Sequence, residues 1–124
     1  MAVVAAGSAL AALVTLTGAG TASAQQRNLD WHGSQGAVDN SPANGMPSWG
    51  WVYAAPNTEG GWSTVSATLE IRYADDGYAY LSQDVGHSAS WNLYAKVVGA
   101  RVCTLRKSAQ DEFSYDCPSW TYVA

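Results

Sequence analysis

The segment Gly86-His87-Ser88-Ala89-Ser90 comes closest to a catalytic motif. In the G-x-S-x-G pattern of a nucleophile elbow, the serine sits on a sharp turn between a strand and a helix, within a sheet that helices flank. Here Ser90 replaces the second glycine, and no segment with a helical pattern lies nearby. We therefore interpret His87 and Ser88 as part of a polar loop and predict no hydrolytic triad.

The remaining titratable residues give no pattern of metal ligands or of paired acids. His32 and His87 are far apart in sequence, and the two cysteines leave none to spare for a zinc site. Asp75-Asp76-Gly77 resembles a fragment of a calcium loop, but it lacks the alternating ligands and the closing glutamate. Glycosidase chemistry needs two carboxylates across a cleft; the ten acidic residues do not decide this by themselves, and a domain this small seldom forms such a cleft. The sequence thus predicts no catalytic residue, no metal and no cofactor.

Aromatic side chains are the unusual feature of the sequence, with six tryptophans, seven tyrosines and one phenylalanine. Such rings either fill a small core or form a contact surface for a ligand. Trp49, Trp51 and Tyr53 alternate along the chain and would share one face of an extended strand, with Trp62 beyond the following turn. Flat rings in a row can stack on the apolar faces of sugars. These four residues are the predicted ligand-binding residues.

Cys103 and Cys117 are the only cysteines. An even number of cysteines in a chain that leaves the cytosol favours a disulfide, and their spacing fits neither a C-x-x-C redox motif nor a zinc site. We expect a structural disulfide that closes a loop and stabilises the fold by about 3 kcal/mol.

Residues 1–24 are predicted to be a cleavable secretory signal peptide. Ala2 to Leu16 is an uncharged run of mainly apolar residues, and Ala22-Ser23-Ala24 matches the small-residue cleavage signal. Polar residues and glycine interrupt the run before it reaches the about 20 residues that span a bilayer, so a membrane anchor is the weaker interpretation. We therefore expect a secreted, extracellular protein.

Removal of the signal peptide leaves 100 residues, enough for a single domain with one core. The formal net charge is −4. Nucleic-acid binding depends on clustered Lys and Arg, and attachment to anionic lipid depends on basic segments, so the charge argues against both. The sequence does not predict an oligomeric state.

Residues 25–47 are predicted to be an irregular N-terminal arm, because Gly and Pro recur there among Asn, Ser and Asp. The antiparallel β domain is expected over residues 48–124, where apolar and polar residues alternate. Asp75-Asp76-Gly77 predicts a hairpin turn between strands at 64–73 and 78–83. One long strand is expected at 90–107, with a bulge or bend at Gly99, and a last strand at 113–122 brings Cys117 beside Cys103.

Short alternating strands with frequent turns and no helical pattern predict an all-β fold. We favour a small antiparallel β-sandwich stapled by the disulfide, with a small β-barrel as the alternative. The first functional hypothesis is a non-enzymatic binding domain for an extracellular polysaccharide or protein. The alternatives are an enzyme inhibitor that acts through the disulfide-closed loop, and an antimicrobial protein or toxin, although acidic proteins rarely lyse membranes.

Overall fold

The computed structural model describes residues 26–123, and the regular secondary structure in that range consists of β-strands alone. No helix in this range is long and apolar enough to cross a membrane. The predicted signal peptide lies outside the described residues. The strands are β2 (Gln26–Trp31), β3 (Ser34–Asp39), β4 (Ser48–Tyr53), β5 (Thr58–Glu59), β6 (Trp62–Tyr73), β7 (Tyr78–Asp84), β8 (Ser88–Leu93), β9 (Val97–Ser108), β10 (Phe113–Asp116) and β11 (Thr121–Tyr122).

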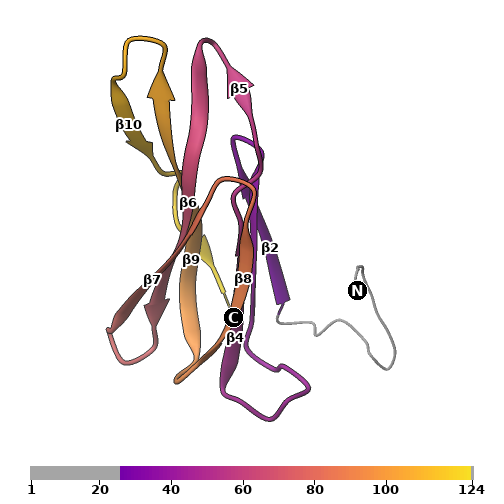
Figure 1. The fold of residues 1–124 in the computed structure, drawn as a ribbon. Helices are drawn as coiled ribbons and strands as arrows, with labels where there is room; N and C mark the ends of the chain where they lie inside the picture. Colours follow the sequence, from indigo (N-terminus) through magenta and orange to yellow (C-terminus); the bar gives the residue numbers. More distant parts are fainter. Residues whose placement is uncertain (1–25, 124) are drawn as a thin grey trace.

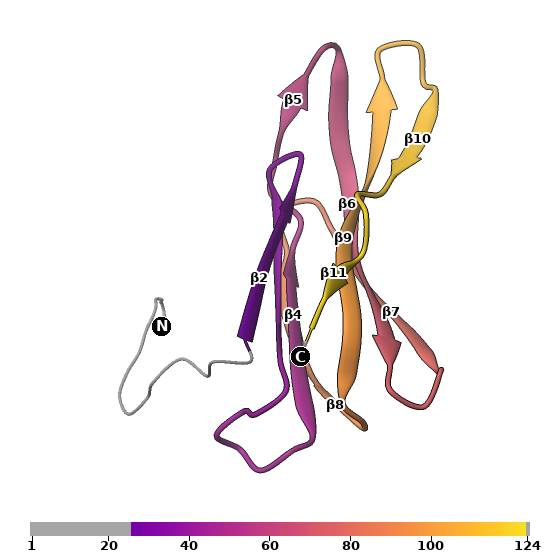
Figure 2. The ribbon, with the colours of Figure 1, turned by 180° about the vertical axis from the view of Figure 1, so that it is seen from behind.

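The strands form two antiparallel sheets that pack against each other (Figure 1). The four-stranded sheet has the order β2-β3-β4-β8. In the six-stranded sheet, β6 and β9 pair along most of their length at the centre. Strands β5 and β7 both pair with β6, while β10 and β11 pair with opposite ends of β9 (Figure 2). The predicted antiparallel β-sandwich is therefore confirmed.

Alternation of side chains explains why these segments are strands. In β4 the small or apolar residues Gly50 and Val52 are buried, whereas the intervening aromatic residues are only half-buried. In β6 the buried core residues are Ala67, Leu69, Ile71 and Tyr73, and they alternate with polar ones. A strand that is apolar on one side packs that side on the core and leaves the other for solvent or ligands.

The core lies between the two sheets, and two glycines let the sheets approach each other. Gly36 in β3 and Gly50 in β4 are buried and face the six-stranded sheet. A Cβ atom on Gly36 would lie 2.6 Å from Cγ2 of Val102, and one on Gly50 would lie 3.1 Å from Cδ2 of Leu69. Branched side chains of one sheet thus occupy the space that glycine leaves in the other.

The predicted irregular arm is wrong for residues 26–39, which form the antiparallel hairpin of β2 and β3. Its two-residue turn, His32-Gly33, has positive φ at both positions, 51° and 84°. Such turns match the twist of a hairpin, so Gly33 helps to pair the strands rather than break them. Gly36 is tolerated inside β3 because Val102 fills the space beside it. Within the described part of the predicted arm, residues 40–47 and the His32-Gly33 turn lack strand structure.

The single strand expected at 90–107 is two strands, β8 and β9, which belong to different sheets. Residues 94–96 make the crossing, and Ala74 N donates a hydrogen bond to the carbonyl of Lys96 there. Continuous β-branched and aromatic sequence does not reveal such a crossing. The predicted bulge near Gly99 is confirmed, because the pairing of β6 with β9 shifts register directly after the Arg72–Gly99 pair.

The remaining turn and strand predictions hold with smaller changes. Strands β6 and β7 form the hairpin predicted around Asp75-Asp76-Gly77, but it is Asp76 that takes positive φ, at 69°. Gly77 N donates a hydrogen bond to Oδ1 of Asp75, which fixes the turn. The last predicted strand, 113–122, is divided into β10 and β11, and both parts pair with β9.

Candidate functional site

Three of the four predicted ligand-binding residues lie together on the outer face of the four-stranded sheet. Trp49, Trp51 and Tyr53 are half-buried and alternate with the buried, inward-facing residues of β4. The rings of Trp51 and Tyr53 are near-parallel, with an interplanar angle of 28° and 6.5 Å between centroids. We call the outer side of this sheet, with these three residues along its middle, the ring face.

Short polar side chains border the rings on the ring face. In register, β3 places Gln35, Ala37 and Asp39 directly opposite the three aromatic residues, and on the other side β8 places Ser88, Ser90 and Asn92 opposite them. Ala37 is only 5% exposed although it faces outward, so neighbouring side chains cover it. The resulting surface is a strip of rings between hydroxyl, amide and carboxylate groups.

The charge of the ring face is neutral to acidic. Alternation along β2 and β3 places Asp30 and Asp39 outward, and no outward position of β2, β3, β4 or β8 holds Lys or Arg. None of these outward strand positions offers a cation to a carboxylated or phosphorylated ligand. The surface therefore suits a neutral, hydroxyl-rich ligand better than an anion.

Trp62, the fourth predicted residue, does not join the other three. It begins β6 in the six-stranded sheet, where it lies opposite Ser108 and Glu59. The guanidinium of Arg106 lies 5.9 Å from the Trp62 ring centroid, a cation–π distance. Trp62 follows the next turn in the sequence, which predicts that its ring extends the row of Trp49, Trp51 and Tyr53. The chain instead changes sheet between Tyr53 and Trp62.

All six indoles are half-buried, so none is a fully buried core residue and none projects freely. Trp91 packs against the core from the inner side of β8. The most exposed aromatic residues are tyrosines and the phenylalanine, on β7, β10, β11 and the β8–β9 connection. The sequence shows how many rings there are, but only the sheets show which of them face outward.

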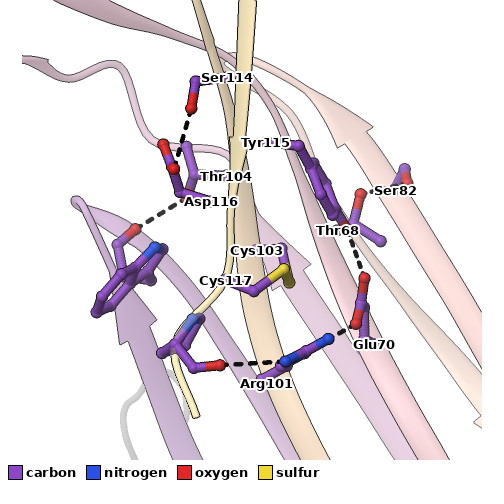
Figure 3. The surroundings of a disulfide bond; sticks show 12 residues. Thr68, Glu70, Ser82, Arg101, Cys103, Thr104, Ser114, Tyr115, Asp116 and Cys117 are labelled. Atoms are coloured by element: carbon purple, nitrogen blue, oxygen red, sulfur yellow. Dashed lines mark hydrogen bonds and ion pairs between the residues drawn. A yellow bond between two sulfur atoms is a disulfide. The ribbon is translucent and has the colours of Figure 1, made fainter. Parts of the chain in front are cut away.

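The disulfide between Cys103 and Cys117 is confirmed, and it joins β9 to the chain directly after β10 (Figure 3). Beside it, Arg101 Nε donates a hydrogen bond to Oε1 of Glu70 at 2.8 Å. The hydroxyl of Tyr115 donates to Oε2 of the same carboxylate at 2.7 Å. Burial and this hydrogen bond raise the pKa of Tyr115 to about 12.

Glu70 is a buried carboxylate that the sequence pattern does not single out as a candidate site residue. Its place in the alternation of β6 predicts a wet position, yet it is 6% exposed, because it lies at the centre of the sheet with Arg101 and Tyr115 against it. Both cysteine sulfurs also lie close to its carboxylate. Disulfide sulfurs carry no thiolate, so these three residues do not form a metal site.

Two ion pairs lie within the disulfide-closed hairpin. Arg106 pairs with Asp116 at 2.9 Å, and Lys107 pairs with Asp111 at 3.3 Å. Hydrogen bonding from Arg106 lowers the pKa of Asp116 below its usual range, against an opposing effect of burial. Arg101 pairs with Glu70 on the adjacent strand instead of with an acid of the hairpin.

The histidines have ordinary surroundings. His87 is exposed, and its Nδ1 lies 3.2 Å from the carbonyl oxygen of Val85. Ser88 pairs with Tyr53 at the start of β8. His32 contacts the carboxylate of Glu59, which links the β2–β3 turn to β5 of the other sheet. These contacts hold loops and sheets together and do not assemble a nucleophile with a base.

No protein-family model, curated protein or solved structure matches this chain.

Proposed function

We propose that this protein is a small, secreted, non-enzymatic binding domain that holds a neutral extracellular polysaccharide on its ring face. The observation that carries the proposal is the outward strip of Trp49, Trp51 and Tyr53, bordered by short polar side chains and by no cation. Secretion is supported by the signal-peptide pattern of residues 1–24 and by a disulfide, which persists in oxidising compartments.

The chemistry of the ring face fits a chain of sugar rings. A pyranose presents C–H groups on its flat side, and these are attracted to the negative face of an aromatic ring. Its hydroxyl groups project around the rim, where Gln35, Ser90 and Asn92 are exposed and can exchange hydrogen bonds with them. Alternate residues of a strand are about 7 Å apart, so successive rings can contact successive sugars of one polymer.

Retention on insoluble polysaccharides tests this proposal. The secreted protein should be retained on at least one of cellulose, β-1,3-glucan, chitin or whole cell-wall material, and Trp51→Ala should weaken that binding about tenfold or more, because the central ring is lost. Phe113→Ala is the matched control, since Phe113 is 62% exposed but lies on β10 of the other sheet.

Two outcomes would reject the sugar ligand. The first is no retention on any of these materials, which would leave a protein ligand for the ring face. The second is equal loss of binding in Trp51→Ala and Phe113→Ala, which would mean that retention does not depend on the ring face. Near-ultraviolet circular dichroism of both variants separates loss of the site from loss of the fold.

A second candidate function is inhibition of a secreted enzyme by the β9–β10 hairpin. The disulfide closes its base, and at its tip Ser108 organises the turn through hydrogen bonds that Gln110 N and Glu112 N donate to its hydroxyl. A pre-organised loop loses little entropy when it enters a cleft. Assays against secreted proteases and amylases would detect inhibition, and inhibition that is unchanged after replacement of Cys103 and Cys117 would count against a role for this hairpin.

A further inference from the structure

The outer face of the six-stranded sheet, on the opposite side of the sandwich from the ring face, holds an exposed arginine next to two aromatic rings. The guanidinium of Arg72 lies 5.9 Å from the ring centroid of Tyr78 and 5.8 Å from that of Trp120. The two rings are 6.5 Å apart, although they come from β7 and from the segment before β11. We call Arg72, Tyr78 and Trp120 the Arg72 patch.

The positive charge of Arg72 is not neutralised by the protein. Its neighbour on this face, Arg101, is paired with Glu70, but Arg72 has no carboxylate within ion-pair distance among residues 26–123. Arg72 is exposed, and Tyr78 is 54% exposed. In a protein with net charge −4, this is a local site for a negatively charged group.

The chemistry of the patch selects a ligand with a carboxylate next to a flat apolar surface. A guanidinium matches a carboxylate with two parallel hydrogen bonds, and the two adjacent rings restrict Arg72 so that it loses less freedom on binding. A sugar that carries a carboxylate can place its acid on Arg72 and its C–H face on Tyr78. The guanidinium of Arg101 already lies over the Trp120 ring, 4.3 Å from its centroid, so Trp120 positions Arg72 rather than stacking on the sugar.

We propose that the Arg72 patch binds the uronic acid residues of an acidic polysaccharide. This site is independent of the proposed function, because it uses other residues on the opposite sheet. The polar surroundings favour a sugar over an acidic protein segment: the exposed outward residues of β7 next to the patch are Tyr80 and Ser82, which both carry hydroxyl groups, whereas Thr68 and Glu70 opposite them on β6 are buried. Protein interfaces bury an apolar centre, whereas these groups suit hydroxyl-rich ligands.

The test compares soluble polygalacturonate with the same polymer after full methyl esterification, by isothermal titration calorimetry of the secreted protein. The two polymers share a backbone and differ only at the carboxyl group, which is a charged carboxylate in one and a neutral methyl ester in the other. We expect the acid form to bind about tenfold more tightly or better, as a charge-assisted pair would give, and we expect added salt to weaken it.

The Arg72→Gln variant should abolish the preference for the acid form, and Arg72→Lys should retain part of it, because an ammonium keeps the charge without the planar fork. Lys107→Gln is the matched control: it removes one exposed positive charge from the same sheet, at the far end of β9. It should leave the preference unchanged. Trp51→Ala should also leave it unchanged, whatever its effect on neutral polysaccharides.

Four results would overturn the proposal. Equal affinity for the acid and the ester would remove the role of the carboxylate. An unchanged preference in Arg72→Gln, or an equal loss in Lys107→Gln, would remove the role of Arg72. Binding of poly-glutamate of equal charge with the same affinity would mean that the sugar ring is not recognised and that the patch binds acidic chains in general.

Discussion

At the scale of single residues, the hydrogen bond from Tyr115 to Glu70 has a consequence for stability at high pH. Tyrosine in an unfolded chain loses its proton at a pH of about 10, whereas burial and the carboxylate raise the pKa of Tyr115 to about 12 in the folded protein. Between these values the folded state holds a proton that the unfolded state has lost. The stabilisation is therefore complete below pH 10 and is lost as the pH rises toward 12.

Spectrophotometric titration of the phenols tests this expectation. The difference between the wild type and Tyr115→Phe should be one phenol that titrates near pH 12, and the unfolding free energy of the variant should fall less steeply between pH 10 and 12. A difference spectrum that titrates near pH 10 would contradict the described hydrogen bond.

At the scale of elements, Gly36 determines how closely β3 approaches β9. A methyl group at this position would lie 2.6 Å from Cγ2 of Val102, which has no exposed space to move into. We expect Gly36→Ala to lower the free energy of unfolding by about 1–3 kcal/mol, the range for overpacked cores. Urea denaturation monitored by tryptophan fluorescence measures the change.

Gly99→Ala is the control for that measurement. Gly99 is also a strand glycine, but the nearest atom to a Cβ there is 3.6 Å away, on Trp120 at the outer face. This variant should be as stable as the wild type or slightly more stable, because alanine loses less backbone entropy on folding. Equal destabilisation by both substitutions would mean that the space between the sheets is not what Gly36 provides.

The same scale shows which parts of the fold the sequence predicts and which it does not. Alternation identifies the buried and exposed faces of β4 and β6. Asp75-Asp76-Gly77 identifies the β6–β7 hairpin. Both can be predicted because these signals are local in the sequence. Gly33 and Gly36 were expected to interrupt the chain, since a sequence does not show whether a glycine ends a strand or makes room within it. The crossing from β8 to β9 was missed because both strands have the same composition.

The candidate sites also divide into those that local sequence patterns predict and those that depend on long-range pairing. Trp49, Trp51 and Tyr53 could be found because they share one strand, where spacing alone determines the face. Trp62 could not be excluded from that group, since its sheet depends on long-range pairing. The Arg72 patch and the Glu70 network combine residues from several strands, so no local pattern in the sequence indicates them.

At the scale of the whole molecule, the disulfide is the largest single constraint on the unfolded chain. It closes a loop between residues 14 positions apart, for which the chain-entropy model gives about 3 kcal/mol. We expect the Cys103→Ala, Cys117→Ala double variant to lose about that much unfolding free energy, and reduction of the wild type to have the same effect. A loss below about 1 kcal/mol would show that the β9–β10 pairing alone holds the hairpin in place.

The two sheets face each other through the core, so their outer faces point in opposite directions (Figures 1 and 2). Polymers held on the ring face and on the Arg72 patch would therefore not compete for space. One molecule with both sites occupied would cross-link a neutral polymer to an acidic one, without a second domain or a second copy. Mixtures of two such polymers should then thicken when the protein is added, while either polymer alone should not.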